Sequence, residues 1–90
     1  MEVEFDEAKD ATNRSKHGIS LALSAEFDFD TCLYIVDDSQ DYGEIRIIAV
    51  GFLRATLHVP VFSPRNEEKF RAIMLRKATP HERKKYAEEF

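Results

Sequence analysis

The chain has 90 residues and a mass of 10.4 kDa, with 43% hydrophobic and 33% charged residues and a formal net charge of −4. This length fits a single domain over residues 1–90, and the hydrophobic content is too high for a disordered chain. Because the sequence has one cysteine and neither a signal peptide nor an apolar stretch of about 18 residues, we expect a cytoplasmic protein without disulfides or membrane spans.

The N-terminal part of the chain predicts one strand followed by two helices. Residues 2–5 alternate polar and apolar side chains, as a short strand does. Asp6 can cap the N-terminus of a first helix over Glu7 to Lys16. Ser20 can cap a second, short helix that continues to about Phe27. Gly18 ends the first helix, because glycine readily adopts the left-handed conformation that follows a helix.

The rest of the chain predicts four strands and a final helix. Runs of β-branched and aromatic residues between turn clusters indicate strands over residues 31–36, 45–52, 56–62 and 69–76. Pro60 falls inside the third of them and cannot donate to a ladder, so we expect a bulge at Pro60 or an N–H side that faces outward there. Thr79, Pro80 and Glu82 form a capping box that begins a helix to about Glu89. The order β-α-α-β-β-β-β-α predicts an α+β fold in which an antiparallel sheet carries the helices on one face.

Charge is distributed unevenly along the chain. Residues 1–45 hold 3 basic and 12 acidic residues, a net charge of −9, whereas residues 46–90 hold 10 basic and 5 acidic residues, a net charge of +5. A basic surface can contact phosphates, and an acidic surface can keep a protein soluble or receive a basic partner. The alternative is that both halves are merely solvated surfaces.

The sequence lacks the residue patterns of several common kinds of functional site. His17, His58 and His81 lie in three separate predicted elements, and the one cysteine has no nearby ligand partner, so we expect neither a metal site nor a cofactor. The three glycines are isolated, which argues against a phosphate-binding glycine loop and a nucleophile elbow. His58 is expected to be a half-buried, hydrogen-bonded strand residue, and His81 a first-turn residue of the last helix.

Arginines on the predicted strands are the remaining candidates for chemistry. Arg71 and Arg76 are five residues apart, so they point to opposite faces of a regular strand unless a bulge intervenes. Arg46 lies on the strand over 45–52, and Arg65 lies in a loop from which a guanidinium can reach a phosphate. For each arginine taken singly, solvation or a carboxylate partner is the alternative.

The end of the first predicted helix allows two interpretations. Cations favour a helix C-terminus and glycine caps it, so a structural role explains Lys16, His17 and Gly18 together. The functional interpretation is that His17 transfers a proton and Lys16 contacts a phosphate. The residue types alone leave both interpretations open.

A series of short motifs runs through nearly the whole chain: Glu4-Phe5-Asp6 with Lys9, Lys16-His17-Gly18, Asp38, Gly43-Glu44-x-Arg46, Gly51, Arg65, Arg71-x-Ile73-x-x-Arg76-Lys77-Ala78 and Glu82-Arg83-x-x-Tyr86. Their order and spacing resemble the BrnT family, the toxin half of a bacterial type II toxin–antitoxin pair, with a compact ribonuclease fold similar to RelE. The sequence departs from the family pattern at Phe62, Asn66 and Met74, and Met74 is expected to share a strand face with Arg76.

The resemblance implies a toxin that cleaves RNA without a metal ion and arrests growth. In that reaction the 2′-OH attacks its own phosphate and leaves a cyclic phosphate and a 5′-OH. The resemblance implies catalytic roles for Lys16, His17, Arg65 and Arg76, and RNA-binding roles for Arg46, Arg71 and Lys77. Two other functions stay open: gyrase inhibition without catalysis, as in ParE toxins, and an inactive toxin that acts as a co-repressor of its antitoxin.

The resemblance also implies a protein partner. BrnT-type toxins pair with ribbon-helix-helix antitoxins, which dimerise, so we expect a BrnA-like antitoxin in a 2:2 heterotetramer that binds operator DNA only through the antitoxin. The half with a charge of +5 suits an acidic antitoxin segment as well as RNA. The half with a charge of −9 is then expected to face solvent and to leave DNA contact to the partner.

Overall fold

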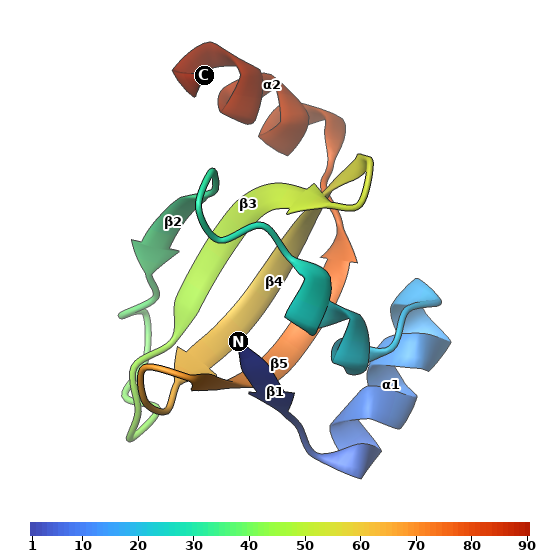
Figure 1. Cartoon of the computed structure of the whole chain (residues 1–90), viewed down its shortest axis with the longest axis vertical. Helices are drawn as coiled ribbons and strands as arrows, with labels where there is room; N and C mark the ends of the chain where they lie inside the picture. The colour runs from blue at the N-terminus through green and yellow to red at the C-terminus, as the bar shows by residue number, and fades with distance from the viewer.

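A computed structural model describes all 90 residues, and its elements are drawn in Figure 1. They are, in chain order, β1 (Glu2–Glu4), α1 (Glu7–His17), the 3₁₀ helix η1 (Leu21–Glu26), β2 (Leu33–Val36), β3 (Ile47–Leu53), β4 (Thr56–Pro64), β5 (Lys69–Lys77) and α2 (Pro80–Glu89). This order and the α+β class confirm the prediction from the sequence, with the second helix in the 3₁₀ form. No helix combines the length and the apolar character that a membrane span requires.

The helices begin and end at the capping residues that the sequence indicates. The Asp6 carboxylate accepts the first free N–H groups of α1, and Gly18 ends this helix in the left-handed conformation at φ 71°. The Ser20 hydroxyl caps η1 in the same way. At the start of α2, the Thr79 hydroxyl and the Glu82 carboxylate each accept a backbone N–H of the other residue, which completes a capping box.

The five strands form one mixed sheet in the order β1-β5-β4-β3-β2. The strands from β2 to β5 pair antiparallel, but β1 runs parallel to β5, with Glu2 opposite Lys69. The expectation of a wholly antiparallel sheet is therefore wrong. Short hairpins force only β3, β4 and β5 to alternate in direction, whereas most of the chain separates β1 from β5 and leaves the direction of that pair free.

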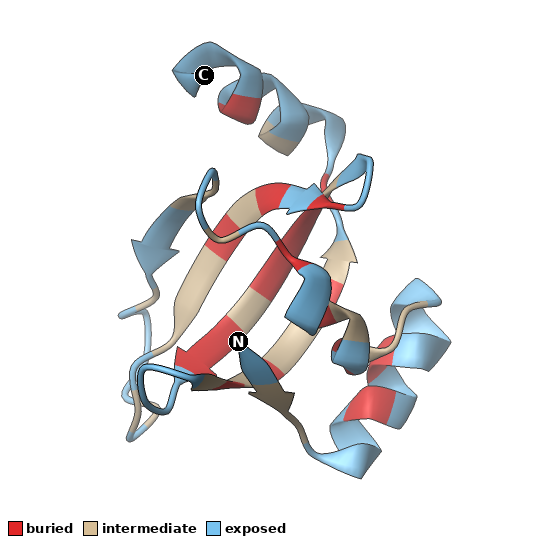
Figure 2. Ribbon diagram, in the orientation of Figure 1, coloured by how far each residue is buried: buried red, intermediate tan, exposed pale blue.

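One face of the sheet, here called the core face, carries the hydrophobic core. Its fully buried members come from η1, the segment after it and strands β3 to β5: Leu21, Phe27, Ala49, Leu53, Phe62, Phe70, Ala72 and Leu75. Phe29 packs edge-to-face against Phe27, Phe62 and Phe70, with ring centroids between 5.0 and 5.3 Å apart. Figure 2 shows buried residues in red along the middle strands β3 and β4. The opposite side is called the outer face below.

The helices do not all lie on the core face, contrary to the expectation. η1 covers that face, whereas α1 lies along the part of β5 that β1 leaves unpaired. There the Asn13 amide donates to the Leu75 carbonyl at 2.8 Å and accepts the Leu75 N–H at 3.1 Å, as a neighbouring strand would. α2 lies beyond the strand ends in Figure 1, and Tyr86 packs against Phe52 of the outer face at a centroid distance of 5.6 Å.

Pro60 lies in the central strand β4 and is fully buried. The ladder between β3 and β4 is interrupted there, between the pairs Ile48–Val61 and Gly51–His58, but it resumes in the same register. The missing N–H of Pro60 therefore interrupts the pairing locally without inserting a residue. Neither a bulge at Pro60 nor an outward-facing edge is found, so that expectation is wrong.

The bulge lies on β5 instead. Val61 of β4 is opposite Met74, whereas the next residue, Phe62, is opposite Ala72. Ile73 is therefore an extra residue on β5, and the alternation of side chains reverses across it. Ala72 and Leu75 both reach the core face as a result.

Candidate functional site

The bulge at Ile73 decides which arginines share a face. In a regular strand Arg71 and Arg76 would point to opposite sides, but the extra residue places both on the outer face. Arg46 precedes β3, and its carbonyl accepts the Asp37 N–H at 2.8 Å, which extends the ladder with β2 by one pair. The structure therefore brings Arg46, Arg71 and Arg76 to the outer face.

Glu44 joins three of the candidate arginines at one end of this face. Arg71 donates to Glu44 Oε1, and Arg46 Nε lies 3.4 Å from the same oxygen. Arg65 Nη1 lies 4.0 Å from Glu44 Oε2, while its Nε donates to Glu4 Oε1 at 2.8 Å. These five residues are called the arginine cluster, and their three positive and two negative charges leave it with a net charge of +1.

The electrostatics keep Glu44 ionised and its guanidinium neighbours in place. Burial raises the pKa of Glu44, but the charge of Arg71 and hydrogen bonds from Arg71 and Arg46 outweigh burial and lower the pKa. The Arg46 guanidinium also lies 4.0 Å above the centre of the Tyr42 ring. Arg71 Nε is buried without a hydrogen-bond partner. The three guanidinium groups together carry about 15 N–H donors, whereas the two carboxylates offer about eight lone pairs, so donors remain for an anion.

Arg76 lies at the other end of β5, about 15 Å along the strand from Arg71. Its two terminal nitrogens donate to the two carboxylate oxygens of Glu82 on α2, at 2.7 and 2.9 Å. These hydrogen bonds lower the pKa of Glu82 to about 2 and raise the pKa of Arg76. A phosphate would therefore meet Arg76 through its Nε or by displacing Glu82.

Lys16 and His17 line a groove of about 340 Å³ between α1 and β5. Lys9 joins them, because residues seven apart lie on the same side of a helix. The β5 wall of the groove consists of Ile73, which is the bulge residue, and Met74. Met74 is three residues from Arg71, so about 10 Å of strand separates this groove from the arginine cluster.

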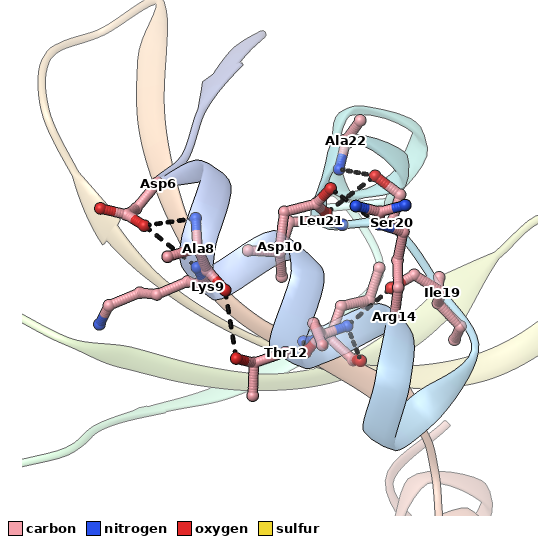
Figure 3. A network of polar contacts seen from close by, with 12 residues as sticks. Asp6, Ala8, Lys9, Asp10, Thr12, Arg14, Ile19, Ser20, Leu21 and Ala22 are labelled. Atoms are coloured by element: carbon pink, nitrogen blue, oxygen red, sulfur yellow. Dashed lines mark hydrogen bonds and ion pairs between the residues drawn. The ribbon is translucent and has the colours of Figure 1, made fainter.

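The opposite side of α1 is anchored by buried polar contacts, shown in Figure 3. The Asp10 carboxylate accepts the Leu21 N–H at 2.7 Å and the Ser20 hydroxyl at 3.0 Å. The hydrogen bond from Leu21 is the main reason why the pKa of Asp10 is lowered. Lys9 and Thr12 point away from these contacts in Figure 3. The helix is therefore fixed on one side and presents its lysines on the other.

Three predicted residues lie apart from these groups. Lys77 is exposed and pairs across the sheet with His58, on the side opposite to Arg76. His58 is a hydrogen-bonded strand residue as expected, with its Nδ1 2.9 Å from the Thr56 carbonyl oxygen, but it is buried and not half-buried. His81 is exposed in the first turn of α2, also as expected.

Sequence reasoning did not identify Glu44, Glu82 or Lys9 as site residues. Helical spacing could have added Lys9 to Lys16, because both belong to one side of α1. Glu44 and Arg71 are 27 residues apart and meet only through the sheet, so no local signal connects them.

Comparison with known proteins agrees with these features. A family model described as the ribonuclease toxin BrnT of type II toxin–antitoxin systems matches residues 5–82. The crystal structure of the Brucella abortus ribonuclease toxin BrnT is similar, with 27% identity and a TM-score of 0.61 over 88% of this chain and 97% of that one. No match was found among curated proteins. Because the family model covers most of the sequence, including the groove and all three clustered arginines, the chain belongs to the BrnT family of type II ribonuclease toxins.

Proposed function

We propose that this toxin acts in the cytoplasm, cleaves RNA without a metal ion and arrests growth when it is not bound by its antitoxin. The observation that carries the proposal is the convergence of Arg46, Arg65 and Arg71 beside the lysine-lined groove of α1. Both groups border the bulged part of β5, so one RNA strand can cross them together.

Cleavage by the 2′-OH requires positive charge and two proton transfers. The 2′ oxygen forms a bond to phosphorus and gives up its proton, which a general base accepts. The bond from phosphorus to the 5′ oxygen then breaks, and a general acid, either a protonated side chain or water, donates a proton to the 5′ oxygen. Between these events the phosphorane carries extra negative charge, which guanidinium and ammonium groups stabilise. The products are a cyclic phosphate and a 5′-OH.

The geometry supports a division of roles. Arg65 is the most exposed arginine of the cluster and lies in a loop, so we assign the reacting phosphate to it. Arg46 and Arg71 bind the adjoining RNA. The groove of α1 is about 10 Å from the cluster, so this division of roles requires the exposed Arg65 loop to move towards the groove when RNA binds. There His17 takes the 2′ proton and Lys16 contacts the same phosphate. Arg76, about 15 Å along β5 from Arg71, contacts a second phosphate of the same strand through Nε. Lys77, whose side chain lies on the opposite side of the sheet from Arg76, binds RNA that passes around the end of β5.

Incubation of the purified protein with RNA in excess chelator tests this function. We expect fragments with cyclic phosphate and 5′-OH ends. Arg65→Ala should slow cleavage by about 10²–10³, as the loss of one donor to a developing charge does. Arg54→Ala is the matched control. Arg54 lies in the turn between β3 and β4, is exposed, and forms an ion pair only with Glu26 at the end of η1.

Three results would contradict the proposal. One is RNA that stays intact in chelator and is cut only when a divalent metal is added. Another is equal cleavage by the Arg65 and Arg54 variants. The third is growth arrest with intact RNA and a DNA-damage response, which would favour gyrase inhibition. Normal growth with intact RNA would favour the remaining alternative, in which the protein is an inactive toxin that acts as a co-repressor of its antitoxin.

For the partner, we propose a BrnA-like ribbon-helix-helix antitoxin in a 2:2 heterotetramer. A dimeric antitoxin presents two equivalent toxin sites, which supports this stoichiometry. The basic residues of the site are assigned to RNA, and residues 1–45, with a charge of −9, are poorly suited to contact operator DNA, so DNA binding is assigned to the antitoxin. Light scattering of the co-purified pair and a gel shift of the toxin alone test both parts. A heterodimer of one toxin and one antitoxin, or operator binding by the toxin alone, would contradict them.

A further inference from the structure

The edge strand β2 presents unpaired backbone groups to solvent. The Asp37 N–H bonds to the Arg46 carbonyl, and hydrogen-bonded pairs alternate along an antiparallel ladder. The backbone of Ile35 therefore faces β3, whereas the N–H and C=O groups of Tyr34 and Val36 point away from the sheet. No other strand pairs with that side of β2. These groups can accept one further strand.

The side chains of this edge are apolar and exposed. Tyr34, Ile35 and Val36 are 67%, 64% and 56% exposed, and nearby Ile45 is 62% exposed. Sheet edges that stay free are usually shortened or carry charged residues within the strand. β1 follows this rule, because two of its three residues are glutamates. β2 contains no charged residue, so it has the character of an interaction surface.

A groove of about 420 Å³ adjoins β2 on the outer face, between the sheet and α2. Its floor is apolar and its α2 wall is polar, with lining residues that include Leu33, Ile35, Ile48, Val50, His81 and Lys85. A strand added beside β2 directs every second side chain towards this face. The groove therefore supplies anchoring contacts that a strand of only four residues cannot supply through its backbone alone.

Acidic residues stand at both ends of β2 and indicate the charge of the occupant. Asp28 and Asp30 precede the strand, and Asp37, Asp38 and Asp41 follow it. A hydrogen bond from Thr31 lowers the pKa of Asp28, and hydrogen bonds from Ser39 lower that of Asp37, so both stay ionised. If two copies of this chain paired β2 with β2 antiparallel, each acidic end would face the acidic end of the other copy. Such like-charge contacts are unfavourable, whereas a segment with basic ends is attracted.

We propose that β2 and the groove beneath α2 bind an extended segment of the antitoxin, with alternating apolar residues and basic residues at both ends. This inference rests on the toxin–antitoxin part of the proposed function and not on the ribonuclease site. It places a contact with the antitoxin on the acidic half of the chain, residues 1–45. From the charge distribution alone we expected this half to face solvent. The segment adds one strand next to β2, at the opposite edge of the sheet from β1.

Val36→Pro tests the strand addition, because proline removes an N–H that points outward and leaves the pairing with β3 intact. Val36→Thr is the matched control, since it keeps the N–H and suits a strand. The probe is a synthetic peptide of alternating Val and Thr with two Lys at each end, titrated to millimolar concentration against isotope-labelled protein. We expect the amide signals of Tyr34 and Val36 to shift and to gain protection from exchange.

The expected affinities distinguish this site from other surfaces. Val36→Thr should bind like the parent protein, Val36→Pro about tenfold more weakly, and a peptide with Glu in place of Lys also about tenfold more weakly. If Val36→Pro does not fold, Ile35→Lys is used in its place. This variant should weaken the binding of the peptide with Lys ends and not that of the peptide with Glu ends.

Absence of shifts at Tyr34 and Val36, or equal binding of the two peptides, would overturn the proposal. So would a dimer of the parent chain that Val36→Pro abolishes, because β2 would then bind a second copy. RNA cleavage is measured on the same variants. Unchanged cleavage with weakened peptide binding is expected, and a failure of cleavage in all proteins would count against the ribonuclease proposal alone.

Discussion

The ion pair between Arg76 and Glu82 attaches α2 to the sheet and can be tested by one substitution. Tyr86 adds a hydrogen bond to the Thr31 carbonyl at 2.8 Å and a ring contact with Phe52. Glu82→Gln removes the charge of the pair but keeps an oxygen for the capping box, because glutamine also serves at this helix position. The variant therefore isolates the ion pair from the helix cap.

The pKa of Glu82 gives the size of the effect. It falls from an ordinary value of 4.5 to about 2, which corresponds to at most about 3 kcal/mol. The two side chains are 29% and 24% exposed, so solvent screening reduces this value to about 1–2 kcal/mol. For a domain of this size, Glu82→Gln should lower Tm by about 5–15 °C at neutral pH.

The pH dependence has a definite sign. Because folding lowers the pKa of Glu82, its stabilisation is complete above pH 4.5 and is lost as the pH falls towards about 2. Thermal unfolding followed by circular dichroism should therefore show a difference in Tm between parent and variant at neutral pH that narrows in acid. Glu88→Gln is the matched control on exposed α2 surface. A Glu82→Gln protein that melts with the control, or a difference independent of pH, would refute the reasoning.

Two further substitutions test how the fold is held. Asn13→Ala leaves the N–H and C=O of Leu75 without partners at the edge of β5, so urea unfolding should show a loss of about 2–3 kcal/mol. A loss below about 0.5 kcal/mol would contradict this role. Gly51→Ala places a Cβ 2.8 Å from Phe27 Cζ and 2.9 Å from Cys32 Cβ, so it should cost about 1–3 kcal/mol. An unchanged Tm would show that the two side chains move aside freely.

Most element positions could be predicted because their signals are local. A capping side chain, a left-handed glycine or a run of β-branched residues acts within a few residues of the element that it defines. Asp6, Gly18 and Thr79 do so here, and the helix boundaries agree with the prediction to within about one residue. The strand ends were predicted less closely. β2 and β3 begin at Leu33 and Ile47 instead of residues 31 and 45, and β4 continues to Pro64 instead of residue 62.

The direction of β1 and the place of the bulge depend on pairing between distant segments. β1 meets β5 across almost the whole chain, and no residue in either strand specifies a parallel pair. Pro60 gave a physical reason for a bulge, yet the extra residue is Ile73 on the neighbouring strand. An apolar residue such as Ile73 carries no mark of this role in the sequence.

In the candidate site too, the groups that local sequence signals indicate differ from those that pairing between distant segments brings together. Lys16 and His17 adjoin in the sequence and stay together in the groove of α1. Arg71 and Arg76 share a face only because of the bulge, and each then meets a carboxylate from a different element. The residue types were therefore visible in the sequence, but their grouping into one cluster and one separate ion pair was not.

The charge balance of the arginine cluster explains why Glu44 belongs in a site for an anion. Three guanidinium groups repel one another, and without a carboxylate between them their side chains would spread into solvent. Glu44 holds them on one face, and with Glu4 it leaves a net charge of +1. One phosphodiester carries a single negative charge and makes this group neutral. The carboxylate thus lowers the attraction for RNA in general while it orders the donors before RNA arrives, and catalysis depends on such prior order more than on total charge.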